Sequence, residues 1–396
     1  MANINASIQS HAENYPDKKR IRIAIALFYF SLGFTFASWA SRIPEIKTAL
    51  KLSDATFGSI LFALPVGQFL MMSFSGKLVT HFGSRRVILF ALPGYTLCLS
   101  NLALATHGWQ LAIGLFLFGI FGNMCNISIN TQGVGAEKIY KRPIMAAFHG
   151  GWSMAGFTGA LVGLTMINLK IPPLIHFWVV IGIVLTIVSL NFGKLIPGKT
   201  GLAKTVGTKK KLFSKPDSGL VQLGIIGFCS MASEGAMFDW SGIYFKDVVK
   251  APHSLVILGY TSFMIMMATG RFISDGLAVR FGRKHLLQVS GILISCGLLI
   301  SVLFPYIIPS TLAFMMVGLG VSSIVPSVYS AAGRHGTIAP GIALATVSSV
   351  SYLGFLMGPP LIGYISAAAG LRYSFAVIGI FGFCITLLVS RIKAIH

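Results

Sequence analysis

The sequence contains twelve apolar segments, each long enough to cross a lipid bilayer as an α-helix. A membrane-spanning helix needs about 20 consecutive, mostly apolar residues. The segments are continuous rather than alternating, which argues against a transmembrane β-barrel. Of 396 residues, 55% are hydrophobic and only 10% are charged, so too few polar side chains are present to coat a soluble particle. We therefore predict an all-α membrane protein whose twelve spans cover residues 21–41, 53–77, 86–106, 109–136, 143–168, 172–193, 220–246, 255–279, 284–304, 309–333, 339–368 and 371–391.

A basic turn occurs at the same place in each half of the chain. Phe82–Arg86 follows the second apolar segment and Phe281–Lys284 follows the eighth, with the two Phe-Gly pairs 199 residues apart. Gly159 and Gly358, in the fifth and eleventh segments, are separated by the same 199 residues. Matched registers at half the chain length indicate two repeated, pseudo-symmetric halves of six helices each.

The repeat predicts how the chain is divided. The N-terminal half covers 21–193 and the C-terminal half covers 220–391, with short tails at 1–20 and 392–396. Residues 194–219 join the halves and carry seven lysines among Gly, Thr, Ser and Pro, without an apolar period. Such a composition is typical of a flexible linker.

The net charge of +21 is distributed unevenly along the chain. If the N-terminus is cytoplasmic and the spans alternate, 24 of the 31 Lys and Arg residues lie on the cytoplasmic side. This is the positive-inside pattern, so we expect both termini and the linker in the cytoplasm. The lysines of the linker then indicate topology rather than a nucleic-acid surface. Residues 1–20 are polar and the first apolar segment is long enough to remain as an anchor, so no cleavable signal peptide is expected.

Several functional classes lack their motifs. We find no Walker-type phosphate loop, zincin motif or nucleophile elbow, which argues against an ATP-driven pump and an intramembrane enzyme. The five cysteines all fall inside apolar segments and are interpreted as packing residues. We expect no metal and no cofactor.

With its two basic turns and two six-segment halves, the chain resembles the major facilitator superfamily over essentially its whole length. The family's Gly-rich basic signature corresponds to Gly76–Arg86, although Thr80 stands where the usual acidic residue would be. A second copy begins at Gly270 and ends at Arg283. The resemblance implies alternating access between two six-helix halves, a monomer, and a cytoplasmic gate formed by Gly76, Gly83, Arg85, Arg86, Arg271, Asp275, Gly282 and Arg283.

Arg271 and Asp275 are better candidates for the charged contact of this gate than the residues of the first motif, because they lie one helical turn apart on one face. The alternative is an ordinary positive-inside helix end with a local ion pair. Three further stretches resemble a fucose-permease-related branch of bacterial inner-membrane transporters: Ser41–Lys47, Phe148–Ser153 and Glu234–Trp240. Most of that branch has no assigned substrate, so the resemblance does not identify the solute.

Of the ten acidic residues, Glu234 and Asp239 alone lie well inside an apolar segment. A charge near the bilayer centre costs about 2.5–3.5 kcal/mol on insertion scales, so such residues usually face a cavity. Desolvation favours the protonated form of a carboxyl group, which suits Glu234 to proton coupling. Asp239 lies about 7.5 Å further out and about 140° around the helix. We place Asp239 in the outer cavity or in a salt bridge, and a buried pair neutralised by Arg42 or another base is the alternative.

His149 lies in the fifth segment and is the third candidate for proton transfer, because an intramembrane histidine can relay protons. It could equally be a hydrogen-bonding contact between helices, since Gly150 and Gly151 follow it.

The fourth segment carries three asparagines at helical spacing. Asn123, Asn126 and Asn130 fall on one face, where carboxamides can bind the hydroxyl or carbonyl groups of a polar solute. Amides also join membrane helices, which is the alternative interpretation. Other candidates for the substrate cavity are Trp39, Trp152, Trp240 and Tyr352, as rings for stacking, and Arg42, which could attract an anion. Interfacial anchoring and packing are the alternatives for the rings, and snorkelling is the alternative for Arg42.

Together these features predict a secondary transporter that works by alternating access, is coupled to protons and moves a small polar organic solute, sugar-like in character. Proton-driven efflux of lipophilic compounds is the main alternative, and a membrane sensor that binds without transporting is another. An inward-facing set of Asn123, Asn126, Asn130, Glu234 and Asp239 would favour a polar solute, whereas an inward surface of Phe and Met would favour efflux.

Overall fold

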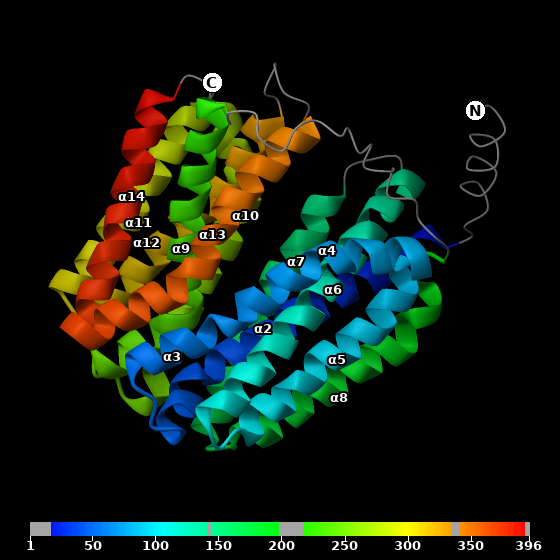
Figure 1. Ribbon diagram of the computed structural model, residues 1–396, viewed down its shortest axis with the longest axis horizontal. Helices are drawn as coiled ribbons and strands as arrows, with labels where there is room; N and C mark the ends of the chain where they lie inside the picture. The colour runs from blue at the N-terminus through cyan, green and yellow to red at the C-terminus, as the bar shows by residue number, and fades with distance from the viewer. Residues whose placement is uncertain (1–16, 141–143, 198–216, 334–339, 393–396) are drawn as a thin grey trace.

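The structure, a computed structural model, describes residues 17–140, 144–197, 217–333 and 340–392. Within these ranges the chain forms α-helices and two short 3-10 turns, and no strand. Figure 1 shows two helical bundles lying side by side, one from each half of the chain.

The N-terminal half contains seven helices that make six spans. They are α2 (Lys18–Ala49), α3 (Asp54–Leu61), α4 (Ala63–Phe82), α5 (Ser84–Leu104), α6 (Gly108–Tyr140), α7 (Met145–Asn168) and α8 (Pro173–Asn191), followed by the 3-10 turn η1 (Phe192–Lys194).

The C-terminal half contains six spans. They are α9 (Ser218–Asp247), α10 (Leu258–Phe281), α11 (Arg283–Leu303), α12 (Ile307–Gly333), α13 (Pro340–Ala369) and α14 (Leu371–Arg391), with the 3-10 turn η2 (His253–Leu255) before α10.

The twelve predicted segments match these helices, which confirms the all-α membrane fold. Within the described residues, eleven segments are long and apolar enough to cross a membrane. The twelfth, α7, has 24 residues, which is also sufficient in length. The second span is the one that is divided, into α3 and α4. Pro65 lacks the N–H that would bond to the carbonyl of Leu61, and α3 ends at Leu61.

Glycines at equivalent positions hold the helices of each half together. A Cβ atom added to Gly119 would lie 2.1 Å from the carbonyl oxygen of Leu64, and one added to Gly318 would lie 2.2 Å from that of Phe263. Both members of the second pair lie 199 residues after those of the first. Helices in a bilayer gain stability from such close backbone contact rather than from the hydrophobic effect. The same small residues therefore set the α4–α6 and α10–α12 contacts in both halves.

The two basic turns contain glycines that need an unusual backbone conformation. Gly83 has a φ of 85° and Gly282 a φ of 79°, a region that side-chain-bearing residues rarely adopt. Each glycine ends one helix and precedes the next without a longer loop, between α4 and α5 and between α10 and α11. This explains why the Phe-Gly pair recurs in both halves.

We call the end of the bundle where α8 ends and α9 begins the linker face, and the other end the opposite face. The halves are tied together at the opposite face. Lys47 of α2 forms ion pairs with Asp54 and, at 3.7 Å, with Asp247 of α9. Ser366 of α13 donates a hydrogen bond to Asp54. Figure 1 shows the two bundles meeting near α3 and diverging toward the linker face.

Candidate functional site

The central polar group is an ion pair between two helices of the C-terminal half. Glu234 lies midway along α9, and its Oε1 atom is 3.3 Å from Nη2 of Arg271 on α10. The Glu234 side chain is 10% exposed and that of Arg271 is 27% exposed. A carboxylate this deep in a span is stable in its charged form only with a partner, and Arg271 supplies one.

Arg271 also reaches across to the N-terminal half. Its Nη1 atom donates a hydrogen bond to Ser153 Oγ on α7 at 3.1 Å. Its guanidinium carbon lies 5.5 Å from the centre of the Trp152 ring, within the range of a cation–π contact. The ion pair of α9 and α10 is thus connected directly to α7 of the other half.

The neighbouring polar groups of the N-terminal half form a hydrogen-bonded chain. Tyr29 on α2 donates to Asn130 Oδ1 on α6 at 2.8 Å, and Asn130 Nδ2 donates to Asn126 Oδ1 at 2.6 Å. The His149 ring lies edge-on to Tyr29, with 5.3 Å between the ring centres. Asn126 and His149 are exposed, although each lies within a span.

The ring contact with Tyr29 places the His149 side chain toward the interior of the molecule rather than toward lipid. On the C-terminal side, Tyr329 of α12 interacts electrostatically with Glu234. Polar groups from α2, α6, α7, α9, α10 and α12 therefore surround one region between the halves.

Tyr352 on α13 contacts the N-terminal half directly. Its hydroxyl donates a hydrogen bond to Gln68 Oε1 at 2.8 Å and lies 3.1 Å from the carbonyl oxygen of Pro65. Its ring is stacked near Phe69, with centres 6.4 Å apart. Tyr352 thus lies at the interface of the halves.

Asp239 has a different environment from Glu234. Among the residues that the structure describes, it forms no hydrogen bond and no ion pair, and it interacts electrostatically with Tyr260. The preceding residue, Phe238, contacts the rings of Phe36 and Phe263 at 5.3 and 5.6 Å. Asp239 is therefore a carboxyl group without a cationic partner beside an aromatic cluster.

The salt bridge considered for Asp239 and Arg42 is not formed. Arg42 is 1% exposed and lies between α2 and α8. Its guanidinium contacts Glu45 at 2.6 Å, His176 at 3.1 Å and the carbonyl oxygen of Ile171 at 2.8 Å. In this conformation Arg42 therefore does not face the central polar group, because its donors are occupied within the N-terminal half.

Three other predicted cavity residues are packed differently from expectation. Trp39 and Trp240 are both fully buried, and Trp240 packs edge-on against Phe57 at 5.7 Å. Asn123 accepts a hydrogen bond of 2.7 Å from Ser75 on α4, so it joins two helices of one half. In this conformation Trp39 and Trp240 are packing residues, and Asn123 is half-buried and bonded within the N-terminal half.

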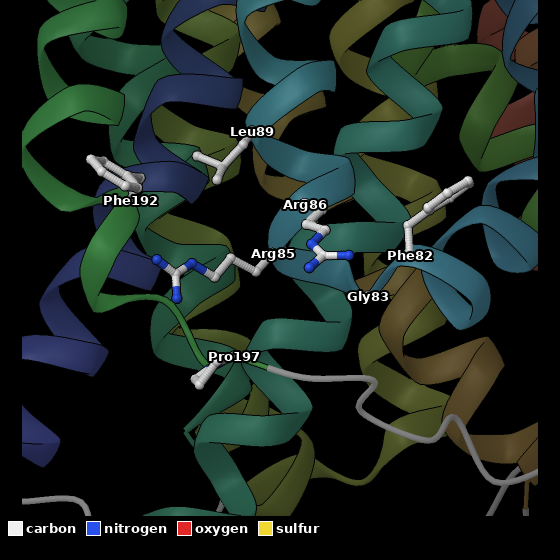
Figure 2. Close-up of a pocket in the computed structure, with 7 residues that line it drawn as sticks. All are labelled: Phe82, Gly83, Arg85, Arg86, Leu89, Phe192 and Pro197. Carbon is white, nitrogen blue, oxygen red and sulfur yellow. The ribbon is translucent and has the colours of Figure 1, made fainter.

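The residues predicted for the first gate motif surround a pocket at the linker face, shown in Figure 2. Arg85 and Arg86 lie beside Gly83 at the start of α5, and the pocket is completed by Phe82, Leu89, Phe192 and Pro197. The Arg85 guanidinium lies 6.0 Å from the centre of the Phe192 ring. Gly76, one helix earlier, has open space around its Cα.

Arg271 of the second motif binds Glu234 and Ser153 through its guanidinium. The side chain of Asp275, the partner expected on the same helical face, lies outside the described part of the chain. Gly282 and Arg283 mark the α10–α11 junction. In this conformation Arg271 belongs to the central polar group.

Two contact residues, Tyr29 and Ser153, are absent from the predicted site. Tyr29 lies in an aromatic run and Ser153 follows a glycine pair, so neither carries an isolated signal in the sequence. The one sequence signal for Tyr29 and Ser153 is that they are polar residues inside spans. Which helices pack together, and hence which way these side chains face, is known only from the structure.

Twelve spans in two matched bundles around a central polar group define a polytopic membrane protein of the transporter type. Residues 23–337 match the Major Facilitator Superfamily, and the chain belongs to this family. It is a secondary transporter of small molecules and not an enzyme.

Similar chains support the family assignment. The uncharacterised transporter y4wD of Sinorhizobium fredii is 30% identical over 93% of this chain and 97% of its own length. An uncharacterised MFS-type transporter of Yersinia pestis is 29% identical over 94% of each chain.

Solved structures share the fold. A mutant of the nucleoside transporter NupG has a TM-score of 0.78, with 12% identity, over 94% of this chain and 100% of its own. A D-xylose-proton symporter has a TM-score of 0.73, with 14% identity, over 94% of this chain and 97% of its own.

Proposed function

We propose that this chain moves a small polar organic solute across a bacterial inner membrane by alternating access and that protons drive the movement. The main support is the Glu234–Arg271 ion pair, which lies within the spans and bonds to Ser153 across the halves at 3.1 Å. Protonation of Glu234 removes the charge that holds Arg271, so proton binding can change how the halves contact each other.

The polar groups around the pair support a polar solute. Asn126, Asn130 and His149 offer donors and acceptors, and Trp152 offers a ring face. Hydroxyl groups suit such a site, so a sugar-like solute is the first choice. Binding near the midplane between two halves is usual for this class of transporter.

The contacts between the two halves are distributed unevenly between the two faces of the protein. The halves are tied together at the opposite face by Lys47, Asp54, Asp247 and Ser366 and diverge toward the linker face. With both termini and the linker cytoplasmic, as the charge distribution indicates, the ties at the opposite face lie on the external side of the membrane.

The second candidate is efflux of lipophilic compounds. Phe36, Phe238, Phe263 and Phe355 form an aromatic cluster with ring centres 5.3 to 6.2 Å apart, close to the interface of the halves. A lipophilic compound could bind against these rings. The buried ion pair and the exposed amide favour the polar solute, since an apolar cargo would leave these groups unsatisfied.

The test is solute flux in proteoliposomes under an imposed proton gradient, using sugars, nucleosides, organic acids and lipophilic dyes. We expect the polar solutes, and not the dyes, to accumulate when the outside is acidic. Accumulation of solute to the same level with and without the proton gradient would contradict proton coupling. Export of dyes alone would support the second candidate, and saturable binding without flux would identify a sensor.

A further inference from the structure

Arg271 has unused capacity to bind a ligand. A guanidinium group carries five N–H donors. Within the described residues, it contacts Glu234 through one oxygen at 3.3 Å and Ser153 at 3.1 Å. The contact with Glu234 is a single one rather than the two parallel hydrogen bonds that an arginine and a carboxylate form at their strongest. The Arg271 side chain is 27% exposed, so another group can reach it.

Glu234 on α9 is the acidic group that contacts Arg271 among the described residues. His149 of α7 interacts with Arg271, and Tyr329 of α12 interacts with Glu234. Neither His149 nor Tyr329 is an anion at neutral pH in its ordinary state. Within the described part of the chain, Glu234 is therefore the counter-charge of Arg271. The side chain of Asp275, one turn further along α10, lies outside that part.

Protonation of Glu234 would leave the Arg271 cation, inside a membrane span, without the counter-charge that contacts it among the described residues. An unpaired charge there is costly, by about 2.5–3.5 kcal/mol on insertion scales. A neutral solute cannot remove this cost, because hydroxyl groups bring no opposite charge. An anionic solute can, and it fits the planar fork of the guanidinium.

We infer that the transported solute carries a carboxylate or a similar small anionic group, which binds Arg271 in place of Glu234. This inference rests on the proposed function and specifies its substrate class. The rest of the solute faces Asn126, Asn130 and the Trp152 ring, which suits a hydroxylated body. The expected cargo is a small hydroxylated organic acid.

Proton and anion then bind together. Binding of the proton makes binding of the anion more favourable, and the reverse also holds. The proton neutralises Glu234 and so releases Arg271, and the anion then neutralises the positive charge of Arg271. Binding of the acid should tighten as the pH falls. Entry of a monovalent anion with one proton moves no net charge, so the pH gradient and not the membrane potential should drive accumulation.

The test uses Trp152 as a reporter. Purified protein is titrated with D-glucuronate and D-galacturonate, and in parallel with the neutral sugars D-glucose and D-galactose, while tryptophan fluorescence is followed. A Trp152→Phe variant identifies the part of the fluorescence change that comes from Trp152. We expect saturable binding of the uronates, tighter at acidic than at alkaline pH, and binding weaker by at least about tenfold for the neutral sugars.

Two variants separate the roles of the charges. Glu234→Gln should bind the uronates tightly at both pH values, because its neutral amide mimics the protonated state. Arg271→Gln should weaken their binding by at least about tenfold. Circular dichroism and thermal unfolding check that both variants are folded.

The outcomes distinguish the inference from the proposed function. Neutral sugars that bind as tightly as uronates, or uronate binding that is independent of Arg271 or absent at both pH values, would overturn the inference. A neutral solute accumulated under a proton gradient would then still support proton-coupled transport. Uronate binding that depends on Arg271, without gradient-driven accumulation, would support the binding preference and contradict the transport function.

Discussion

Arg271 of α10 is hydrogen-bonded to Ser153 of α7, with 3.1 Å between Nη1 and Oγ, and this contact joins the two halves of the molecule. The same guanidinium contacts Glu234 at 3.3 Å. A single side chain therefore touches both the proton-binding candidate and the opposite bundle. A change in the charge of Glu234 can therefore alter the contact between the halves through Arg271 alone.

Substituting Arg271 by lysine tests whether this geometry matters beyond charge. A lysine keeps the positive charge but has a single nitrogen, which cannot bridge Glu234 and Ser153 as the guanidinium fork does. We expect Arg271→Lys to reduce proton-driven accumulation by about tenfold or more, consistent with the loss of charged hydrogen bonds. Initial uptake rates in proteoliposomes provide the measurement.

Arg280→Lys is the matched control, because Arg280 lies on the same helix and stacks near Phe281 at its end. Its uptake should equal that of the parent. If Arg271→Lys were as active as Arg280→Lys, charge alone would suffice and the bridging geometry would have no role.

The contacts of the opposite face should stabilise the described conformation. Asp247→Asn removes one partner of Lys47, which lies in the other half. Exposed ion pairs contribute about 0.2–1 kcal/mol, so the balance of conformations should shift by up to about fivefold. The measurement is cross-linking between cysteines placed at Ser59 and Tyr364, whose hydroxyl groups are 3.0 Å apart across the halves, in a cysteine-free background.

Glu45→Gln serves as the control for this shift, because Glu45 pairs with Arg42 within the N-terminal half. It should leave the cross-linking yield unchanged, whereas Asp247→Asn should lower it. An equal yield in all three proteins would show that the Lys47–Asp247 contact does not hold the halves together.

Close helix contact at Gly119 predicts a strong effect of one methyl group. A Cβ atom there would lie 2.1 Å from the Leu64 carbonyl oxygen, so Gly119→Ala must displace α4 from α6. Overpacking of this kind costs about 1–3 kcal/mol. Thermal unfolding in detergent should show a clear decrease in Tm.

Gly182→Ala is the appropriate comparison, because no atom lies within 4 Å of a Cβ placed at Gly182 in α8. It should keep or raise the Tm, since alanine favours the helix by about 0.5–1 kcal/mol over glycine. Equal Tm values for both variants would contradict the assigned helix contact.

The charge of Asp239 should affect stability. Among the described residues it has no cationic partner, and its neighbour Phe238 packs against other aromatic rings. A carboxylate removed from water without a partner is costly. Asp239→Asn should therefore raise the Tm in thermal unfolding. A Tm equal to or below that of the parent would argue that this carboxyl group is not a source of instability.

The sequence predicted the spans accurately because their signal is local. Length and continuous hydropathy determine whether a segment can cross a bilayer, and the 199-residue offset identified the repeat without any structure. The predicted span 53–77 runs through Pro65, a proline expected to interrupt its span, and the structure divides this segment into α3 and α4, where the hydrogen bond to Leu61 is lost.

The site was predicted less completely, because side-chain partners depend on how helices are rotated and paired. The sequence singled out Glu234 by its unusual position but could not show that its partner is Arg271, 37 residues away on another helix. Arg42 illustrates the opposite case. Its partner Glu45 lies three residues further along the same helix, so that contact was within reach of the spacing rule for helices.

The most direct test of proton coupling compares two kinds of transport in Glu234→Gln. Proteoliposomes containing the parent or the variant are loaded with solute, and both gradient-driven accumulation and exchange at equal concentrations are measured. The account predicts that the parent performs both, whereas the variant retains exchange and loses accumulation under a proton gradient. Accumulation by Glu234→Gln to the parent's level would contradict the role of Glu234 as the coupling residue.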